Sequence, residues 1–217
     1  KNQDAVQVIR EAIPIEPKNS RIYFYLGLVY IQDQNTEEAV ENLKQAISLD
    51  SSNDRYYFNL GVAYDKAGRF EDCIKQMKKA IEYNPSYANA YNYIGYLLAE
   101  KGIRLDESID AIYKALNLEP DNGFFADSLG WAFYKQGKKQ EALKELERAV
   151  ELVPDDPIIR DHLGDVYFAL KMLEESIDQW EKSLELEPED RDIIEEKLLK
   201  TKAMLNKNQK EESIIEN

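Results

Sequence analysis

The chain has 217 residues, of which 43% are hydrophobic, and its 28 basic and 42 acidic side chains give a formal net charge of −14. This length allows a sizeable core, while the acidic balance argues against a surface for nucleic acid or anionic membranes. No apolar run is long enough to span a bilayer, and one cysteine, Cys73, forms no internal disulfide.

The chain opens with a small residue, a bulky residue, a second small residue and a proline: Ala5, Ile9, Ala12 and Pro17. This spacing predicts one amphipathic helix in residues 1–18, which Pro14 should end early. The same order of residue types closes the units that follow. We therefore expect residues 1–18 to be the second helix of a truncated repeat, as in a fragment of a longer array.

Five units follow, each marked by a glycine that recurs at spacings of 34 or 35 residues: Gly27, Gly61, Gly95, Gly130 and Gly164. A fixed period of this size predicts a stacked array of repeats. The expected units are residues 20–53, 54–87, 88–122, 123–156 and 157–190. The third unit has one extra residue, which should lengthen the turn between its two helices.

Each unit predicts two helices that pack closely. The recurring glycine lies in the first helix, and the second helix carries a small residue four positions before a bulky one: Ala39/Leu43, Cys73/Met77, Ser108/Ile112, Ala142/Leu146 and Ser176/Trp180. We expect the glycine to let the two antiparallel helices approach, while the small residues leave room for the large ones. Cys73 is therefore expected to pack rather than react, and Trp180 to lie in the core.

This pattern resembles the tetratricopeptide repeat (TPR), and the resemblance covers all five units. It implies an all-α fold, an α-solenoid of tandem helix-turn-helix repeats that forms a right-handed superhelix. After Pro188, the spacing of Ile194, Leu198 and Leu205 predicts a capping helix at residues 191–205. The polar residues 206–217 are expected to form a disordered tail.

The second half of the chain has a narrower resemblance. Motifs such as Tyr93-Ile94-Gly95-Tyr96 and Asp161-His162-Leu163-Gly164-Asp165 look like the C-terminal part of long bacterial envelope-associated TPR proteins. The resemblance implies a bacterial cell envelope location, either periplasmic or anchored as a lipoprotein, with the cytoplasm as the alternative. It says nothing of the partner.

One histidine is the candidate for catalysis or metal binding. His162, the only histidine, is flanked by Asp161 and Asp165, and such a set could serve as a base or a metal ligand. No second His or Cys lies near it in sequence, and no nucleophile triad, phosphate loop or zinc motif occurs elsewhere. The interpretation is a groove or structural role, with no catalytic residue, metal or cofactor.

The resemblance implies that one stripe of each first helix lines a concave groove for a protein or peptide ligand. The candidate partner-binding residues on it are Arg21, Phe24, Tyr25, Arg55, Phe58, Asn59, Asn92, Tyr93, Tyr96, Asp127, Trp131, Tyr134, Asp161, His162 and Asp165. Tyr93, Tyr96 and Trp131 are expected as central anchors, although some rings should instead pack between neighbouring helices. Basic residues come first in the stripe and acidic ones last, so the ligand's basic end should face the last units.

The resulting hypothesis is a non-enzymatic protein-protein interaction scaffold that binds no nucleic acid and does not insert directly into a membrane. The alternative is the TPR region of a larger enzyme, such as a glycosyltransferase. A third possibility is self-association through exposed repeat ends. The full-length gene product would separate the first two, because a transferase domain favours the enzyme.

Overall fold

Twelve α-helices and no strand make up the part of the chain that the computed structural model describes, the backbone of residues 2–215 and the side chains of residues 4–207. The predicted all-α fold is confirmed. The chain forms two compact units, residues 1–94 and 95–217, and the division between them falls within one helix, α6.

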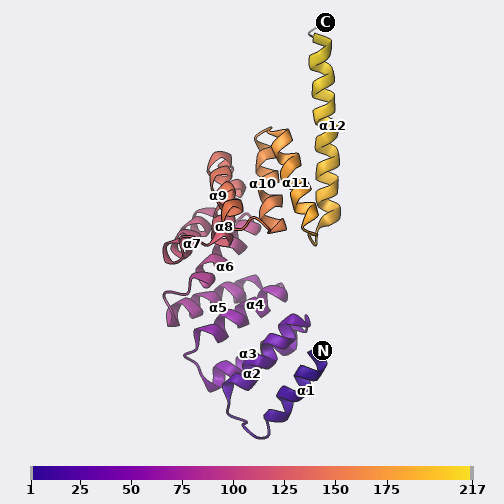
Figure 1. Cartoon of the computed structure of the whole chain (residues 1–217). Helices are drawn as coiled ribbons and strands as arrows, with labels where there is room; N and C mark the ends of the chain where they lie inside the picture. The colour runs from indigo at the N-terminus through magenta and orange to yellow at the C-terminus, as the bar shows by residue number, and fades with distance from the viewer. Residues whose placement is uncertain (1, 216–217) are drawn as a thin grey trace. The chain divides into compact units, whose positions relative to one another are not determined.

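The helices of each unit follow one another in antiparallel pairs (Figure 1). The first unit holds α1 (Asn2–Ala12), α2 (Ser20–Gln32), α3 (Thr36–Leu49), α4 (Asp54–Lys66), α5 (Phe70–Tyr83) and the start of α6 (Ala88–Glu100). The second unit holds the end of α6, then α7 (Leu105–Leu118), α8 (Gly123–Lys135), α9 (Lys139–Leu152), α10 (Pro157–Ala169), α11 (Leu173–Glu185) and α12 (Arg191–Ile215). Each pair from α2/α3 to α10/α11 lies within one of the expected repeat ranges.

Side-chain caps start most first helices. The side chains of Asn19, Asn53, Asn122 and Asp156 each accept a hydrogen bond from a backbone N–H in the first turn of α2, α4, α8 and α10. These N–H groups have no partner inside the helix, so the caps stabilise each start. Pro157 occupies the first turn of α10, where its missing N–H costs nothing.

The turn inside each repeat contains a residue with left-handed backbone geometry, two positions after the first helix ends. Glycine takes this position in three repeats, as Gly68, Gly102 and Gly137, whereas Gln34 and Lys171 take it in the other two. Such a residue reverses the chain and satisfies the last carbonyls of the helix. In the third repeat Arg104 also has a positive φ, of 51°, which accommodates the extra residue predicted there.

Close contact between the two helices of a repeat accounts for the recurring glycine. A Cβ placed on Gly164 would lie 2.5 Å from Trp180 Nε1, and one on Gly130 would lie 2.6 Å from Leu146 Cγ. The small residues of the second helices, Cys73 among them, are fully buried, and Trp180 is almost so. The predicted packing of small against large residues is confirmed.

Helix α12 extends further than the sequence predicted. It packs through Ile194 and Thr201, both buried, and in Figure 1 it continues beyond the end of α11. The tail expected to be disordered from residue 206 is helical up to Ile215, and residues 216–217 lie outside the described residues. Lys207, Gln209, Lys210, Glu211 and Glu212 of this stretch are good helix formers, which explains the difference.

Crossing a bilayer requires a helix that is both long and apolar. None of the described helices meets both requirements.

Candidate functional site

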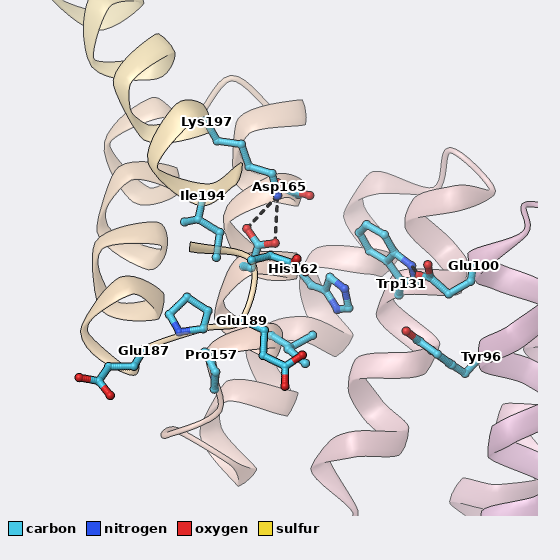
Figure 2. A pocket seen from close by; sticks show the side chains of 14 residues that line it. Tyr96, Glu100, Trp131, Pro157, His162, Asp165, Glu187, Glu189, Ile194 and Lys197 are labelled. Carbon is cyan, nitrogen blue, oxygen red and sulfur yellow. Dashed lines mark hydrogen bonds and ion pairs between the residues drawn. The ribbon is translucent and has the colours of Figure 1, made fainter. Parts of the chain in front are cut away.

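A cleft of about 510 Å³ lies in the second unit. Its walls come from the end of α6, from α8 and α10, from the connection before α12, and from α12 itself (Figure 2). The lining residues are Tyr96, Glu100, Trp131, Pro157, Ile158, Asp161, His162, Asp165, Glu187, Pro188, Glu189, Asp190, Ile194 and Lys197. Several of these side chains come from the first-helix stripe that the sequence singled out.

The floor of the cleft is an aromatic stack. The His162 ring lies on Trp131 with 4.1 Å between ring centroids and 14° between planes, and Tyr134 stacks on Trp131 at 5.2 Å. The ammonium of Lys135 lies 4.5 Å from the Trp131 ring centroid, and Trp131 Nε1 donates a hydrogen bond to Glu100. These contacts leave Trp131 only 8% exposed.

His162 is fixed by a carboxylate from the preceding repeat. Its Nδ1 lies 2.9 Å from Asp127 Oδ1, and both side chains are buried. Burial disfavours the imidazolium, but the carboxylates of Asp127, Asp161 and Asp165 outweigh this and raise the pKa of His162 above its usual 6.5. Because Asp127 is an acceptor, it holds the proton on Nδ1 and leaves Nε2 as the second ring nitrogen at the cleft.

Lys197 of α12 reaches across to two carboxylates of α10. Its Nζ lies 2.8 Å from Asp161 Oδ1 and 2.8 Å from Asp165 Oδ1 (Figure 2). Burial opposes the charge on Lys197, yet the two aspartates raise its pKa above the usual 10.5. Burial also raises the pKa of Asp165 against the opposing effect of Lys197. One cation is thus shared between two acids.

The cleft as a whole is acidic. Among its lining residues, Lys197 is the only Lys or Arg, whereas six are acidic: Glu100, Asp161, Asp165, Glu187, Glu189 and Asp190. The acids of the connection before α12 are exposed. A positively charged group would therefore enter this cleft more favourably than an anion.

The structure brings together several of the predicted site residues, and it changes the environment expected for some of them. Tyr96, Trp131, Asp161, His162 and Asp165 line the cleft, with Asp127 behind His162 and Tyr134 behind Trp131. Stacking on both His162 and Tyr134 buries the indole that was expected to be an open anchor. The two aspartates expected to face a ligand already bind Lys197.

Sequence reasoning missed several residues that line the cleft. Glu100 ends α6 at the repeat position that Lys66 and Lys135 occupy in other first helices, so the repeat period was a signal for it. Lys197 belongs to α12, outside the repeats, where the only signal was the helical spacing of Ile194 and Lys197, which places both on one face of that helix.

The predicted site residues of the first unit mostly contact one another. Phe24 is buried against Tyr56 with 4.8 Å between ring centroids, and the Arg55 guanidinium lies 5.8 Å from the Phe24 ring. Phe58 contacts Tyr93, whose hydroxyl donates to Asp65 at 2.8 Å.

The remaining predicted site residues of the first unit differ in whether their polar groups already have a partner within the chain. The amide Nδ2 of Asn59, expected to bind a peptide backbone, donates to the Arg55 carbonyl at 2.8 Å instead. Asn92 Oδ1 is buried without a hydrogen-bond partner among the described residues. Tyr25 and Arg21 are exposed. This unit therefore has fewer open groups for a ligand than the sequence suggested.

No three His, Cys, Asp or Glu side chains of the described residues form a group that could hold a metal ion.

Comparison with known proteins identifies the repeat. Family models for the tetratricopeptide repeat match residues 54–87 and 159–190, and a further TPR model matches residues 29–68 and 130–171. A TPR repeat-containing protein of Pseudomonas aeruginosa is 43% identical over 58 residues, which are 27% of this chain and 10% of that protein. The match thus spans about a tenth of that relative.

Solved structures share the fold. The crystal structure of MamA matches with a TM-score of 0.63 and 26% identity, over 70% of this chain and 88% of MamA. PilF of Pseudomonas aeruginosa matches with a TM-score of 0.71 and 20% identity, over 80% of this chain and 79% of PilF. A thermophilic TPR protein of Thermus thermophilus has the same TM-score, 0.71, at 19% identity, over 84% and 98% of the two chains.

Proposed function

Because this chain belongs to the tetratricopeptide repeat family, whose members are protein-interaction scaffolds, we propose that it is a non-enzymatic scaffold that binds a peptide or protein segment. The binding site is the cleft of the second unit. Helical repeat arrays present such surfaces because each repeat adds one first helix to the same face.

The observation that carries this proposal is a cleft with both an apolar wall and oriented polar groups. Ile158, at its edge, is 59% exposed, although it lies on a helix whose other apolar residues are mostly covered. His162 and Glu100 are held in place by Asp127 and Trp131, so their free atoms are fixed before a ligand arrives. A volume of about 510 Å³ is in the usual range for ligand sites and admits a few side chains rather than a whole domain.

The test is a selection from a random peptide display library on the full chain, followed by titration of the selected peptides by calorimetry. Ile158→Ser removes the exposed apolar side chain at the edge of the cleft, and we expect it to weaken the selected peptides by about tenfold, the effect of losing one buried apolar contact. Leu118→Ser is the matched control, because Leu118 is an exposed apolar residue of the same unit that does not line the cleft.

Peptides that lose affinity equally in both variants, or in neither, would show that the cleft is not the binding site. Circular dichroism of each variant shows whether the helices remain intact.

A further inference from the structure

We propose that the occupant of the cleft is a segment with a lysine or arginine beside a large apolar residue, and that its cationic group binds between His162 and the unpaired carboxylates. This proposal rests on the proposed function and adds the chemistry of the ligand. Three observations on the cleft support it: its negative charge, the Nε2 atom of His162 without a hydrogen-bond partner, and the way in which Lys197 is bound.

The first observation is an excess of negative charge that the described residues do not neutralise. Lys197 offsets part of the charge of Asp161 and Asp165, with which it pairs. None of the three acids at the opposite wall, Glu187, Glu189 and Asp190, forms an ion pair within the described part of the chain. A cationic side chain that enters here gains attraction from several carboxylates, which also steer its approach.

The second observation is a polar atom without a partner at the floor. His162 is only 8% exposed, its Nδ1 is bound to Asp127, and its Nε2 makes no hydrogen bond to any residue that the structure describes. When the ring is neutral, at a pH above its raised pKa, Asp127 keeps the proton on Nδ1, and Nε2 carries a lone pair that accepts a hydrogen bond. A lysine ammonium or an arginine guanidinium donates such a bond, whereas a ligand carboxylate has nothing to donate.

The third observation is that the cleft already binds one cationic side chain of the chain itself. The ammonium of Lys197 lies 5.8 Å from the ring centroid of Trp180 while both aspartates bind it at 2.8 Å. On the opposite wall a basic side chain of a ligand would find the carboxylates of Glu187, Glu189 and Asp190 beside Pro188. Ile158, exposed at the rim, would contact the apolar neighbour of that side chain.

The experiment measures binding of fluorescein-labelled decapeptides to the full chain by fluorescence anisotropy. One peptide has five leucine-arginine repeats, and the second has five leucine-glutamine repeats. We expect the arginine peptide to bind at least about tenfold more tightly, since several ion pairs of modest strength together reach that factor.

The site is tested with charge-neutralising variants matched in number. The cleft variant combines Glu100→Gln, Glu187→Gln and Glu189→Gln, and we expect it to weaken the arginine peptide about tenfold. The control variant combines Asp110→Asn, Glu151→Gln and Glu185→Gln, which are exposed acids of the same unit outside the cleft. It changes the net charge equally and should alter affinity by less than about twofold.

Two results would overturn the inference. An equal loss in both triple variants would mean that the acidic surface attracts the peptide without a site. Equal affinity for the arginine and glutamine peptides would mean that charge is not what the cleft selects. If Ile158→Ser weakened both peptides in that second case, the cleft would remain a peptide site and the proposed function would survive without this inference.

Discussion

His162 Nδ1 lies 2.9 Å from Asp127 Oδ1, although the two residues are 35 positions apart in the sequence. The bond joins the first helices of two consecutive repeats, α8 and α10, and the stack of His162 on Trp131 joins the same two helices. His162 therefore both stabilises the contact between repeats and fixes the floor of the cleft. Changes at His162 should affect both properties.

The stability of the second unit should fall as the pH rises above 6.5. The folded pKa of His162 is raised by Asp127, Asp161 and Asp165 against the effect of burial, so protonation favours the folded state. This contribution is complete below the unfolded pKa near 6.5 and is lost as the pH rises through the higher folded pKa. Urea unfolding at several pH values between about 6 and 9 measures it.

The control for this pH dependence is His162→Gln, which keeps a hydrogen-bond donor for Asp127 but does not titrate. Its stability should be flatter across the same range. Burial raises the pKa of the Asp165 carboxyl, so its contribution to stability is present below pH 3.8 and is lost as the pH rises from there. The effect of Asp165 on stability therefore falls at more acidic pH than that of His162. An identical slope in both proteins would exclude His162 as the source.

Adding one methyl group at Gly164 should destabilise the last repeat through a clash with Trp180. The new Cβ would lie 2.5 Å from Nε1 and 2.6 Å from Cδ1 of the indole, which is buried and has little room to move. We expect Gly164→Ala to cost about 1–3 kcal/mol of unfolding free energy, as overpacking does. The cost should be smaller in a Trp180→Leu background, where the ring edge is gone.

A double-mutant cycle by urea unfolding measures this coupling. Trp180→Leu loses no hydrogen bond, because the buried indole N–H has no partner among the described residues. Equal costs of Gly164→Ala in both backgrounds would place the strain elsewhere.

The repeat pattern predicted the packing between the two helices of a repeat but only part of the cleft. Gly130 against Leu146 and Gly164 against Trp180 follow directly from a period, since the same contact recurs in every unit. The ion pairs of Lys197 with Asp161 and Asp165 could not be predicted in this way, because α12 is not part of a repeat and its position along α10 depends on packing. The sequence also could not predict the burial of Trp131, since this burial depends on its stacking with His162 of the next repeat.

Cys73 should react very slowly in the folded protein. It is fully buried between the helices of its repeat, and burial raises the pKa of its thiol to about 12, with a smaller effect from Asp65. At a pH of about 8 the reactive thiolate is therefore negligible, and the sulfur is covered as well. We expect Ellman's reagent to label Cys73 only at the rate at which the first unit opens, and at once in concentrated urea. Rapid labelling of the folded chain would contradict the packing role.

Removing the charge of Lys197 should destabilise the second unit and strengthen its binding of cationic peptides. Lys197→Met keeps a similar apolar stem but leaves Asp161 and Asp165 side by side, with side chains only 20% and 19% exposed. We expect a loss of about 1–3 kcal/mol in unfolding free energy, less than for a fully buried pair because water still reaches the site. Part of this loss should be recovered as the pH is lowered and Asp165 takes up a proton, since burial already raises its pKa.

Lys200→Met is the matched control for this variant, because Lys200 pairs with Glu196 on the same helix while both side chains are 70% and 64% exposed. Its effect on stability should stay within about 0.5 kcal/mol, as for other surface substitutions. In the anisotropy titration, Lys197→Met should bind the arginine peptide more tightly than the natural chain does, since it frees two carboxylates. Unchanged affinity in Lys197→Met, together with the expected loss of stability, would show that the ligand's cation does not reach Asp161 and Asp165 and would restrict it to His162 and the acids of the opposite wall.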